Sequence, residues 1–105
     1  MTRFEGGDKM EGKYYISMQT PMGLEKGTIE FIVSGDRLSG RLIAKGVTST
    51  FYGGTVNGNE FEFSGEFKKL IMKIAYTAKG KIEGNNLTAI VHSKFGNFTV
   101  RGIRA

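Results

Sequence analysis

The chain of 105 residues has no cysteine, no tryptophan, a single proline and a single histidine. Without cysteine it has no disulfide, no thiolate metal ligand and no cysteine nucleophile. The lone His92 lacks the second histidine or cysteine that zinc sites commonly use. The serines have no base on the same predicted face, which argues against a Ser-His-Asp triad. We therefore assign no catalytic residue, no metal ligand and no cofactor.

Long apolar segments are also absent. No run approaches the roughly 20 apolar residues that cross a bilayer as a helix. The first residues, Met1-Thr2-Arg3-Phe4-Glu5, lack the apolar core of a signal peptide. The composition, 39% hydrophobic and 24% charged with a net charge of +5, is that of one folded domain. We expect a cytoplasmic protein without a membrane span.

What the chain does have is abundant glycine, 16 residues in all, and a two-residue hydrophobic period. Ile29, Phe31 and Val33, for example, alternate with Glu30 and Ile32. Such alternation is typical of strands with one buried face, and no segment has the 3.6-residue period of an amphipathic helix. The pattern returns about eight times along the chain, which predicts an all-β domain of consecutive antiparallel strands.

Short turn sequences separate the alternating segments. Glycine, asparagine and aspartate supply the positive φ that tight hairpin turns require, and proline followed by glycine suits a type I turn. Lys68-Lys69 has no such residue and is placed as a turn because the alternation restarts at Leu70. The predicted turns are Thr20-Pro21-Met22-Gly23, Gly35-Asp36, Lys45-Gly46, Asn57-Gly58, Lys68-Lys69, Gly84-Asn85 and Gly96-Asn97.

Each two-residue turn determines which residues of its flanking strands lie opposite one another. With these turns, apolar residues face apolar residues across nearly every hairpin, which a shift of one residue would destroy. The predicted partners are Val33 with Leu38 and Ile29 with Leu42, Phe63 with Ile74 and Phe61 with Tyr76, and Phe95 with Phe98 and Val91 with Gly102.

The Asn57-Gly58 turn is the exception, because it places Phe51 on the wrong face of its strand. Two explanations are open. Either Asn57-Gly58-Asn59 is a three-residue loop, or Gly53-Gly54 forms a β-bulge that restores the alternation.

Consecutive hairpins with one buried face predict a closed barrel. Pairing the first strand with the last leaves no free edge, and about eight strands make a barrel whose interior holds side chains or a small ligand. The predicted fold is therefore a single antiparallel up-and-down β-barrel over residues 12–105. Residues 1–11 are predicted to form a polar N-terminal arm.

Gly12-Lys13-Tyr14 in the first strand and Gly102-Ile103-Arg104 in the last resemble the calycin pattern of lipocalins, fatty-acid-binding proteins and avidins. In those families a Gly-x-Trp opens the barrel, and in many members a late Arg or Lys packs across the tryptophan. Residues 27–40 resemble the second and third strands of avidin, and the whole pattern is similar to small bacterial lipocalin-like proteins. The resemblance implies a lipocalin- or streptavidin-like barrel in which Arg104 packs on Tyr14. Avidin's tryptophan-lined biotin pocket has no counterpart here.

The inward positions are rich in aromatic residues, and these are the candidate ligand-binding residues. A packed core and a ligand cavity both fit them, since so small a barrel can be filled by its own side chains. Inward glycines either permit sharp strand coiling or leave room for a ligand. Arg104 either latches the last strand onto Tyr14 by a cation–π contact or binds a carboxylate. The candidate interior residues are Tyr14, Phe31, Phe51, Phe61, Phe63, Tyr76 and Arg104, and the inward glycines are Gly27, Gly40, Gly65, Gly80 and Gly102.

The function predicted from these features is non-enzymatic binding of an apolar or amphipathic small molecule, or of a protein partner. The alternative is an enzyme of the isomerase or cyclase type that positions a substrate inside the barrel with Tyr14, Tyr76 and Arg104. An enzyme needs several ionisable groups that converge in the interior, and the sequence supplies few.

Nucleic-acid binding is a more distant alternative. It needs basic residues interleaved with exposed aromatics, but most aromatics are predicted inward and only Tyr15 and Tyr52 outward. Glu60, Glu62 and Glu66 share an outward face with lysine and form a solvated charged surface rather than paired catalytic carboxylates. The candidate basic stripe consists of Lys73, Lys79, Lys81, Lys94 and Arg101.

Outward isoleucines predict a surface for self-association. In the register above, Ile90 and Ile103 lie opposite each other across the Gly96-Asn97 turn and form an exposed apolar pair. A barrel has no free edge, so association would be face to face, most simply as a two-fold homodimer. The other interpretation is that these isoleucines only satisfy β propensity.

Overall fold

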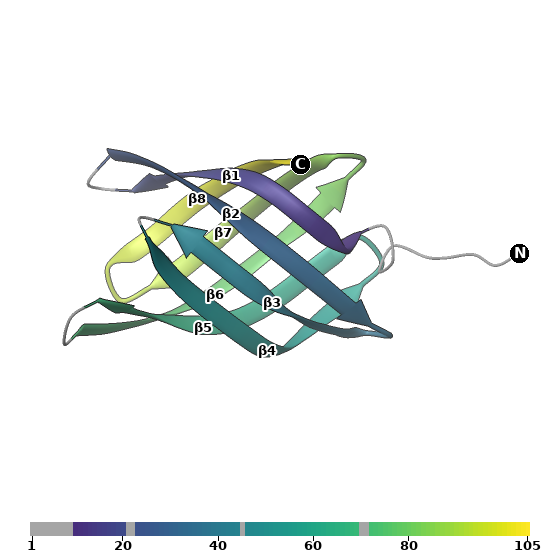
Figure 1. The fold of residues 1–105 in the computed structure, drawn as a ribbon, viewed down its shortest axis with the longest axis horizontal. Coiled ribbons are helices and arrows are strands. Elements are labelled where there is room, and N and C mark those ends of the chain that lie inside the picture. Colours follow the sequence, from purple (N-terminus) through teal and green to yellow (C-terminus); the bar gives the residue numbers. More distant parts are fainter. Residues whose placement is uncertain (1–9, 21–22, 45, 70–71) are drawn as a thin grey trace, which may run out of the picture.

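The computed structural model describes residues 10–20, 23–44, 46–69 and 72–105, and it is a closed barrel of eight antiparallel strands (Figure 1). Each strand pairs with the next along the chain, and the first pairs with the last. The predicted fold class is confirmed. The strands are β1 (Gly12–Thr20), β2 (Gly23–Ser34), β3 (Arg37–Ala44), β4 (Val47–Asn57), β5 (Glu60–Lys69), β6 (Met72–Glu83), β7 (Asn86–Ser93) and β8 (Gly96–Arg104).

The two-residue period decides which side of each strand faces the barrel axis. In β3, Leu38 and Leu42 are buried, whereas Arg37 and Arg41 are exposed. Burying one face of each strand stabilises the fold by roughly 25 cal/mol per Å² of apolar surface removed from water. Closure of the sheet then pairs the backbone groups that an open sheet would leave free at its two edges.

Two-residue loops join the strands at four of the predicted turns. Gly35 and Gly84 both have a φ of 64°, the left-handed conformation that such hairpin turns require. Pro21, Met22 and Lys45 lie outside the described residues, and with them the predicted type I turn. The pairs that bracket the four loops are Thr20–Gly23, Ser34–Arg37, Ala44–Val47 and Glu83–Asn86.

β4 contains the bulge that one explanation of its alternation required. The step from Leu38 to Gly40 in β3 spans two residues, but the partners of these residues in β4, Gly54 and Phe51, are three residues apart. Gly53 accommodates the extra residue with a φ of 72°. The bulge interpretation is confirmed and the three-residue loop is wrong. Asn57 pairs with Glu60, so the loop between β4 and β5 consists of Gly58 and Asn59, one residue later than the predicted Asn57-Gly58 turn.

The turn between β5 and β6 lies two residues later than predicted. Lys68 and Lys69 belong to β5 and pair with β6, so the loop falls at residues 70–71, outside the described part of the chain. Moving the turn by two residues moves each cross-strand partner by four, so that Phe61 lies opposite Gly80 instead of Tyr76. An even shift of the partners keeps every side chain on its predicted face. The observed pairs are Phe61–Gly80, Phe63–Ala78 and Phe67–Ile74, in place of Phe61–Tyr76 and Phe63–Ile74.

The turn between β7 and β8 also differs from the prediction. Ser93 pairs with Gly96, so the loop consists of Lys94 and Phe95 and not of Gly96-Asn97. The Ser93 hydroxyl accepts a hydrogen bond from the Phe95 amide (3.1 Å) and donates one to the Gly96 carbonyl oxygen (3.2 Å), which closes the loop early. The observed pairs are Val91–Phe98, Ala89–Val100 and Ile90–Thr99, in place of Phe95–Phe98, Val91–Gly102 and Ile90–Ile103.

The two ends of the barrel differ in how tightly the inner face is packed. The closed end carries Met10 and the turns that follow β2, β4 and β6, on the right in Figure 1; the open end carries the turns that follow β1, β3, β5 and β7. At the closed end, Met10 and Leu38 are 0% and 1% exposed. At the open end, Phe67 and Phe98 pack against the core but are only partly buried.

Candidate functional site

The candidate aromatic residues form one cluster inside the barrel. Phe31 lies at its centre, and its ring centroid is 5.0 Å from that of Phe61, 5.7 Å from Tyr14, 6.0 Å from Phe63 and 6.2 Å from Phe51. Phe51 and Phe63 are stacked, with centroids 3.8 Å apart. The fold therefore brings these predicted residues together, and it packs them against one another.

Little free volume remains beside this cluster. The interior cavity has a volume of about 20 Å³ and only apolar lining, which includes Met18, Leu42 and Val91. That volume suits about one water molecule, whereas sites for drug-sized ligands occupy roughly 300–1,000 Å³. In this conformation the interior is a packed core.

The inward glycines bring strands close together rather than leave room for a ligand. A Cβ atom at Gly27 would lie 2.2 Å from the carbonyl oxygen of Ile43. At Gly40 a Cβ would overlap the carbonyl oxygen of Glu30 even more severely. At these two glycines, backbone atoms thus occupy the space that a side chain would need, which supports the coiling interpretation.

Three inner-face apolar residues are partly buried at the open end, whereas near the closed end Val33 is partly buried. Along β1 the exposed fraction rises from 0% at Tyr14 to 8% at Met18. Beyond this level Phe67, Ile74 and Phe98 are only partly buried, although each shares the inward face of its strand. We name these three residues the apolar rim.

At the closed end Arg104 forms the predicted latch between β8 and β1. Its guanidinium carbon lies 4.8 Å from the ring centroid of Tyr14, and its Nη1 donates a hydrogen bond to the Glu11 carbonyl oxygen (3.0 Å). The Tyr14 hydroxyl donates to the Met10 carbonyl oxygen (2.7 Å), and the Glu11 carboxylate accepts from the Val33 amide (2.8 Å). Burial raises the pKa of Tyr14, and the nearby Arg104 charge partly offsets that shift. Residues 10 and 11, placed in the polar arm from sequence, thus contact the barrel directly.

Removing the latch should weaken the fold. We expect Arg104→Ala to lower the free energy of unfolding by about 1–2 kcal/mol, through lost packing on Tyr14 as well as lost charge. Urea denaturation measures the effect, with Arg101→Ala as the control, since Arg101 is an exposed arginine on the same strand. Equal stability of Arg104→Ala and wild type would contradict the latch, and loss of ligand by such a stable variant would make Arg104 a binding residue.

Tyr76 forms a buried polar contact that the sequence did not reveal. Its hydroxyl lies 2.9 Å from the Ser49 hydroxyl, and the two side chains are 4% and 1% exposed. Burial raises the pKa of Tyr76, and the hydrogen bond with Ser49 opposes that shift. The available signal was a serine at an inward position of β4, two residues before Phe51.

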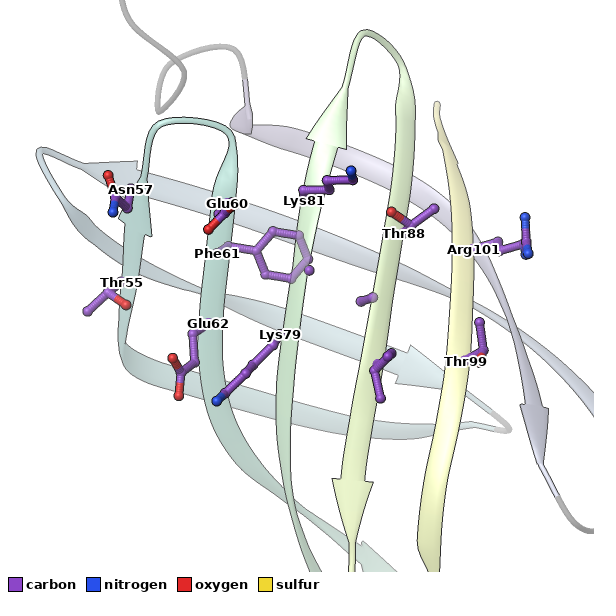
Figure 2. Close-up of a pocket in the computed structure, with 13 residues that line it drawn as sticks. Thr55, Asn57, Glu60, Phe61, Glu62, Lys79, Lys81, Thr88, Thr99 and Arg101 are labelled. Carbon is purple, nitrogen blue, oxygen red and sulfur yellow. The ribbon is translucent and has the colours of Figure 1, made fainter.

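The outer wall carries a charged hollow over β4 to β8, with a volume of about 660 Å³ (Figure 2). Glu60 lies opposite Lys81 and Glu62 opposite Lys79, so opposite charges alternate across β5 and β6. No exposed aromatic side chain is among the described residues that line it, so it lacks the stacking surface used for single-stranded nucleic acid. The candidate basic stripe is divided: Lys79, Lys81 and Arg101 line the hollow, whereas Lys73 lies opposite Lys68 and Lys94 lies in the loop after β7.

The predicted isoleucine pair is not formed. Ile90 and Ile103 are both exposed, as expected, but Ile90 lies opposite Thr99 whereas Ile103 lies opposite Asn86. The shifted turn after β7 separates them. Ile103 instead lies beside the exposed Tyr15 of β1.

No three histidine, aspartate or glutamate side chains of the described residues lie close enough together to hold a metal ion. The Nδ1 atom of His92 lies 2.7 Å from the side-chain oxygen of Asn97, its cross-strand partner. Within the same residues, no helix has the length and apolar character needed to cross a membrane.

A closed antiparallel barrel of eight strands with this latch is a calycin-like fold. Among solved structures the chain is similar to a redesigned β-barrel, mFAP1, bound to DFHBI: the TM-score is 0.74 and the identity 13%, covering 97% of this chain and 100% of that one. It is also similar to apo lipid binding protein 8 (LBP-8) of Caenorhabditis elegans, with a TM-score of 0.55, 10% identity and coverage of 93% and 96%. A mutant of the fluorescent protein UnaG matches with a TM-score of 0.51, 14% identity and coverage of 93% and 97%.

No protein-family model and no curated protein sequence matches the chain. At identities of 10–14% the structural likeness establishes the fold alone.

Proposed function

We propose that the barrel binds a small apolar or amphipathic molecule through its open end. The observation that carries this proposal is the change in packing along the inner face, from complete burial at Tyr14 to the partly exposed apolar rim. Accessible apolar side chains inside a concave protein surface favour apolar ligands. Two of the similar barrels support it, one bound to DFHBI and one named as a lipid binding protein.

The ligand would enter by displacing side chains rather than by filling an existing void. The cavity of about 20 Å³ is lined on one side by Met18, whose unbranched side chain adapts readily to a new neighbour. The apolar rim supplies the contact surface at the entrance. In this proposal the aromatic cluster around Phe31 and the latched Arg104 form the floor beneath the ligand, and Tyr76 forms part of its wall.

The positions of the interior ionisable groups favour binding over catalysis, because these groups do not converge on one site. Arg104 is held by the Tyr14 ring and the Glu11 carbonyl oxygen, while Tyr76 bonds Ser49 on a different side of the core. These contacts divide the three groups proposed for an enzyme between two separate clusters. A protein partner and homodimer formation stay predictions, as does a cytoplasmic location.

Placing a charge on the apolar rim should weaken the binding of a neutral apolar dye. We expect wild type to enhance the fluorescence of Nile red, and Phe98→Asp to weaken its affinity at least about tenfold, because a carboxylate near the ligand loses hydration. Ile103→Asp is the matched control, since Ile103 lies on the same strand as Phe98, is 61% exposed at the closed end and takes the same charge change.

The comparison of the two variants decides the proposal. Unchanged dye fluorescence with wild type at about 100 μM protein would overturn it, because even weak apolar sites bind in that range. Equal losses in Phe98→Asp and Ile103→Asp would also overturn it, since binding would then depend on net charge and not on the open end.

A further inference from the structure

The buried hydroxyls of Ser49 and Tyr76 have one more hydrogen than they can share. Each hydroxyl carries a single hydrogen, and only one of the two lies between the oxygens, which are 2.9 Å apart. Whichever hydroxyl donates, the other keeps a hydrogen that points elsewhere. Among the described residues neither hydroxyl has another hydrogen-bond partner. The pair therefore presents one buried donor without an acceptor, which is unfavourable in apolar surroundings.

Aromatic rings surround this donor. The ring of Phe67 lies 5.2 Å from that of Tyr76, and the ring of Phe63 lies 6.1 Å away at nearly a right angle. Phe51 in turn stacks on Phe63, and their ring centroids are 3.8 Å apart. A molecule that reached the donor would thus place its remaining atoms against apolar surface.

Gly65 allows the two hydroxyls to meet across β5. It lies directly opposite Tyr76, and a Cβ atom there would be 2.6 Å from the Tyr76 oxygen and 3.1 Å from Ser49 Oγ. Because the glycine has no side chain, the tyrosine hydroxyl passes over it from β6 to β4. The polar pair is therefore a product of three neighbouring strands.

The barrel wall beside this pair is hollowed from outside. The pairing of β4 with β5 covers Thr55–Asn57 and Glu60–Glu62, and no pair between these strands is found beyond it in the described residues. Next to that stretch lies an open hollow of about 740 Å³, and the inward residues Phe51, Gly65 and Tyr76 contribute to its lining. Phe51 and Tyr76 are only 1% and 4% exposed, so the hollow borders the wall outside the hydroxyl pair without opening onto it.

We infer that Ser49 and Tyr76 form the polar anchor of the ligand site and donate a hydrogen bond to an acceptor oxygen, a carbonyl or a carboxylate, of a ligand whose apolar body packs on Phe51, Phe63 and Phe67. This inference rests on the proposed function and narrows its ligand class to amphipathic molecules with an acceptor oxygen. The raised pKa of Tyr76 agrees with a phenol that keeps its proton and acts as a neutral donor.

Acetophenone and ethylbenzene test the inference, because they have similar size and differ by one carbonyl oxygen. We expect wild type to bind acetophenone about three to ten times more tightly than ethylbenzene, the effect of one hydrogen bond between neutral groups. Amide chemical shifts measure both affinities. Tyr76→Phe with Ser49→Ala should remove the preference, because neither side chain can then donate a hydrogen bond to the carbonyl oxygen.

A matched control comes from the same part of the barrel wall. Ser64 and Thr77 form an exposed hydroxyl pair on β5 and β6, with oxygens 3.0 Å apart. Ser64→Ala with Thr77→Val should keep the preference for acetophenone. Benzoate distinguishes the two acceptors: tighter binding than acetophenone identifies a carboxylate ligand, and weaker binding a carbonyl ligand.

The outcomes separate the inference from the proposed function. Equal affinities of wild type for acetophenone and ethylbenzene would overturn the inference and leave apolar binding intact, with a buried water molecule as the partner of the donor. Both affinities are measured with the wild-type protein, so this result does not depend on whether a variant folds. A preference that survives in the Ser49→Ala and Tyr76→Phe double variant would overturn the inference as well. Failure of both probes to bind would overturn the inference and the proposed function together.

Discussion

Replacing Phe31 by alanine is expected to destabilise the barrel by about 3–5 kcal/mol, the largest effect of any single truncation in the core. Phe31 is 1% exposed, and four aromatic rings lie with their centroids within 6.2 Å of its own. Alanine would remove the ring, its favourable edge contacts and the support of the four neighbours, and would leave a cavity that a rigid barrel cannot close.

Urea denaturation followed by circular dichroism measures the loss. Phe31→Leu should cost less than Phe31→Ala because it fills part of the volume. Phe95→Ala is the surface control, and we expect it to change stability by no more than about 0.5 kcal/mol. An unfolding free energy of Phe31→Ala within about 1 kcal/mol of wild type would contradict the central position of this ring, since that is the ordinary size of a point-mutation effect.

Gly80→Ala is expected to destabilise the fold by about 3 kcal/mol or more, although it adds a single methyl group. Gly80 lies directly opposite Ala89, and an added Cβ would be 2.6 Å from the Ala89 Cβ and 2.2 Å from the Thr88 carbonyl oxygen. Paired residues of neighbouring strands normally keep their Cβ atoms roughly 4.5–5.5 Å apart. Relief of the overlap requires β6 and β7 to separate, and that would break the closed sheet.

The control for this prediction is Lys79→Ala, an exposed change at the neighbouring position of β6. Thermal unfolding of both variants measures the difference, and a low yield of folded Gly80→Ala would be part of the expected result. A Gly80→Ala variant as stable as Lys79→Ala would mean that β6 and β7 are farther apart at this position.

The strand register shows what hydrophobic alternation can predict and what it cannot. Alternation identified the inward face of every strand, but it left the turn after β5 wrong by two residues, since even shifts preserve the two faces. The observed register places Phe61 opposite Gly80 and Phe63 opposite Ala78. Complementary side-chain size across the pair, together with Glu62 opposite Lys79, was the signal that could have distinguished the two registers.

The candidate site likewise contains one contact that the sequence predicted and one that it did not. The contact between Tyr14 and Arg104 was predicted from the resemblance of their two short motifs to the calycin pattern, and barrel closure brings the two strands together. The bond between Ser49 and Tyr76 was not, because these residues are 27 positions apart and on strands that are not adjacent. It exists only because Gly65, on the strand between them, leaves space for the tyrosine hydroxyl.

Sequence by itself determined a closed antiparallel barrel of eight strands with an aromatic interior, because hydrophobic alternation and turn residues act over a few neighbouring positions. Only the tertiary structure decided that this interior is packed, with the apolar rim left partly exposed at one end. The free volume inside a barrel depends on how closely strands cross at positions such as Gly27 and Gly80, and on which rings meet in the middle. Those distances are set by all eight strands together, so no local segment of the sequence contains them.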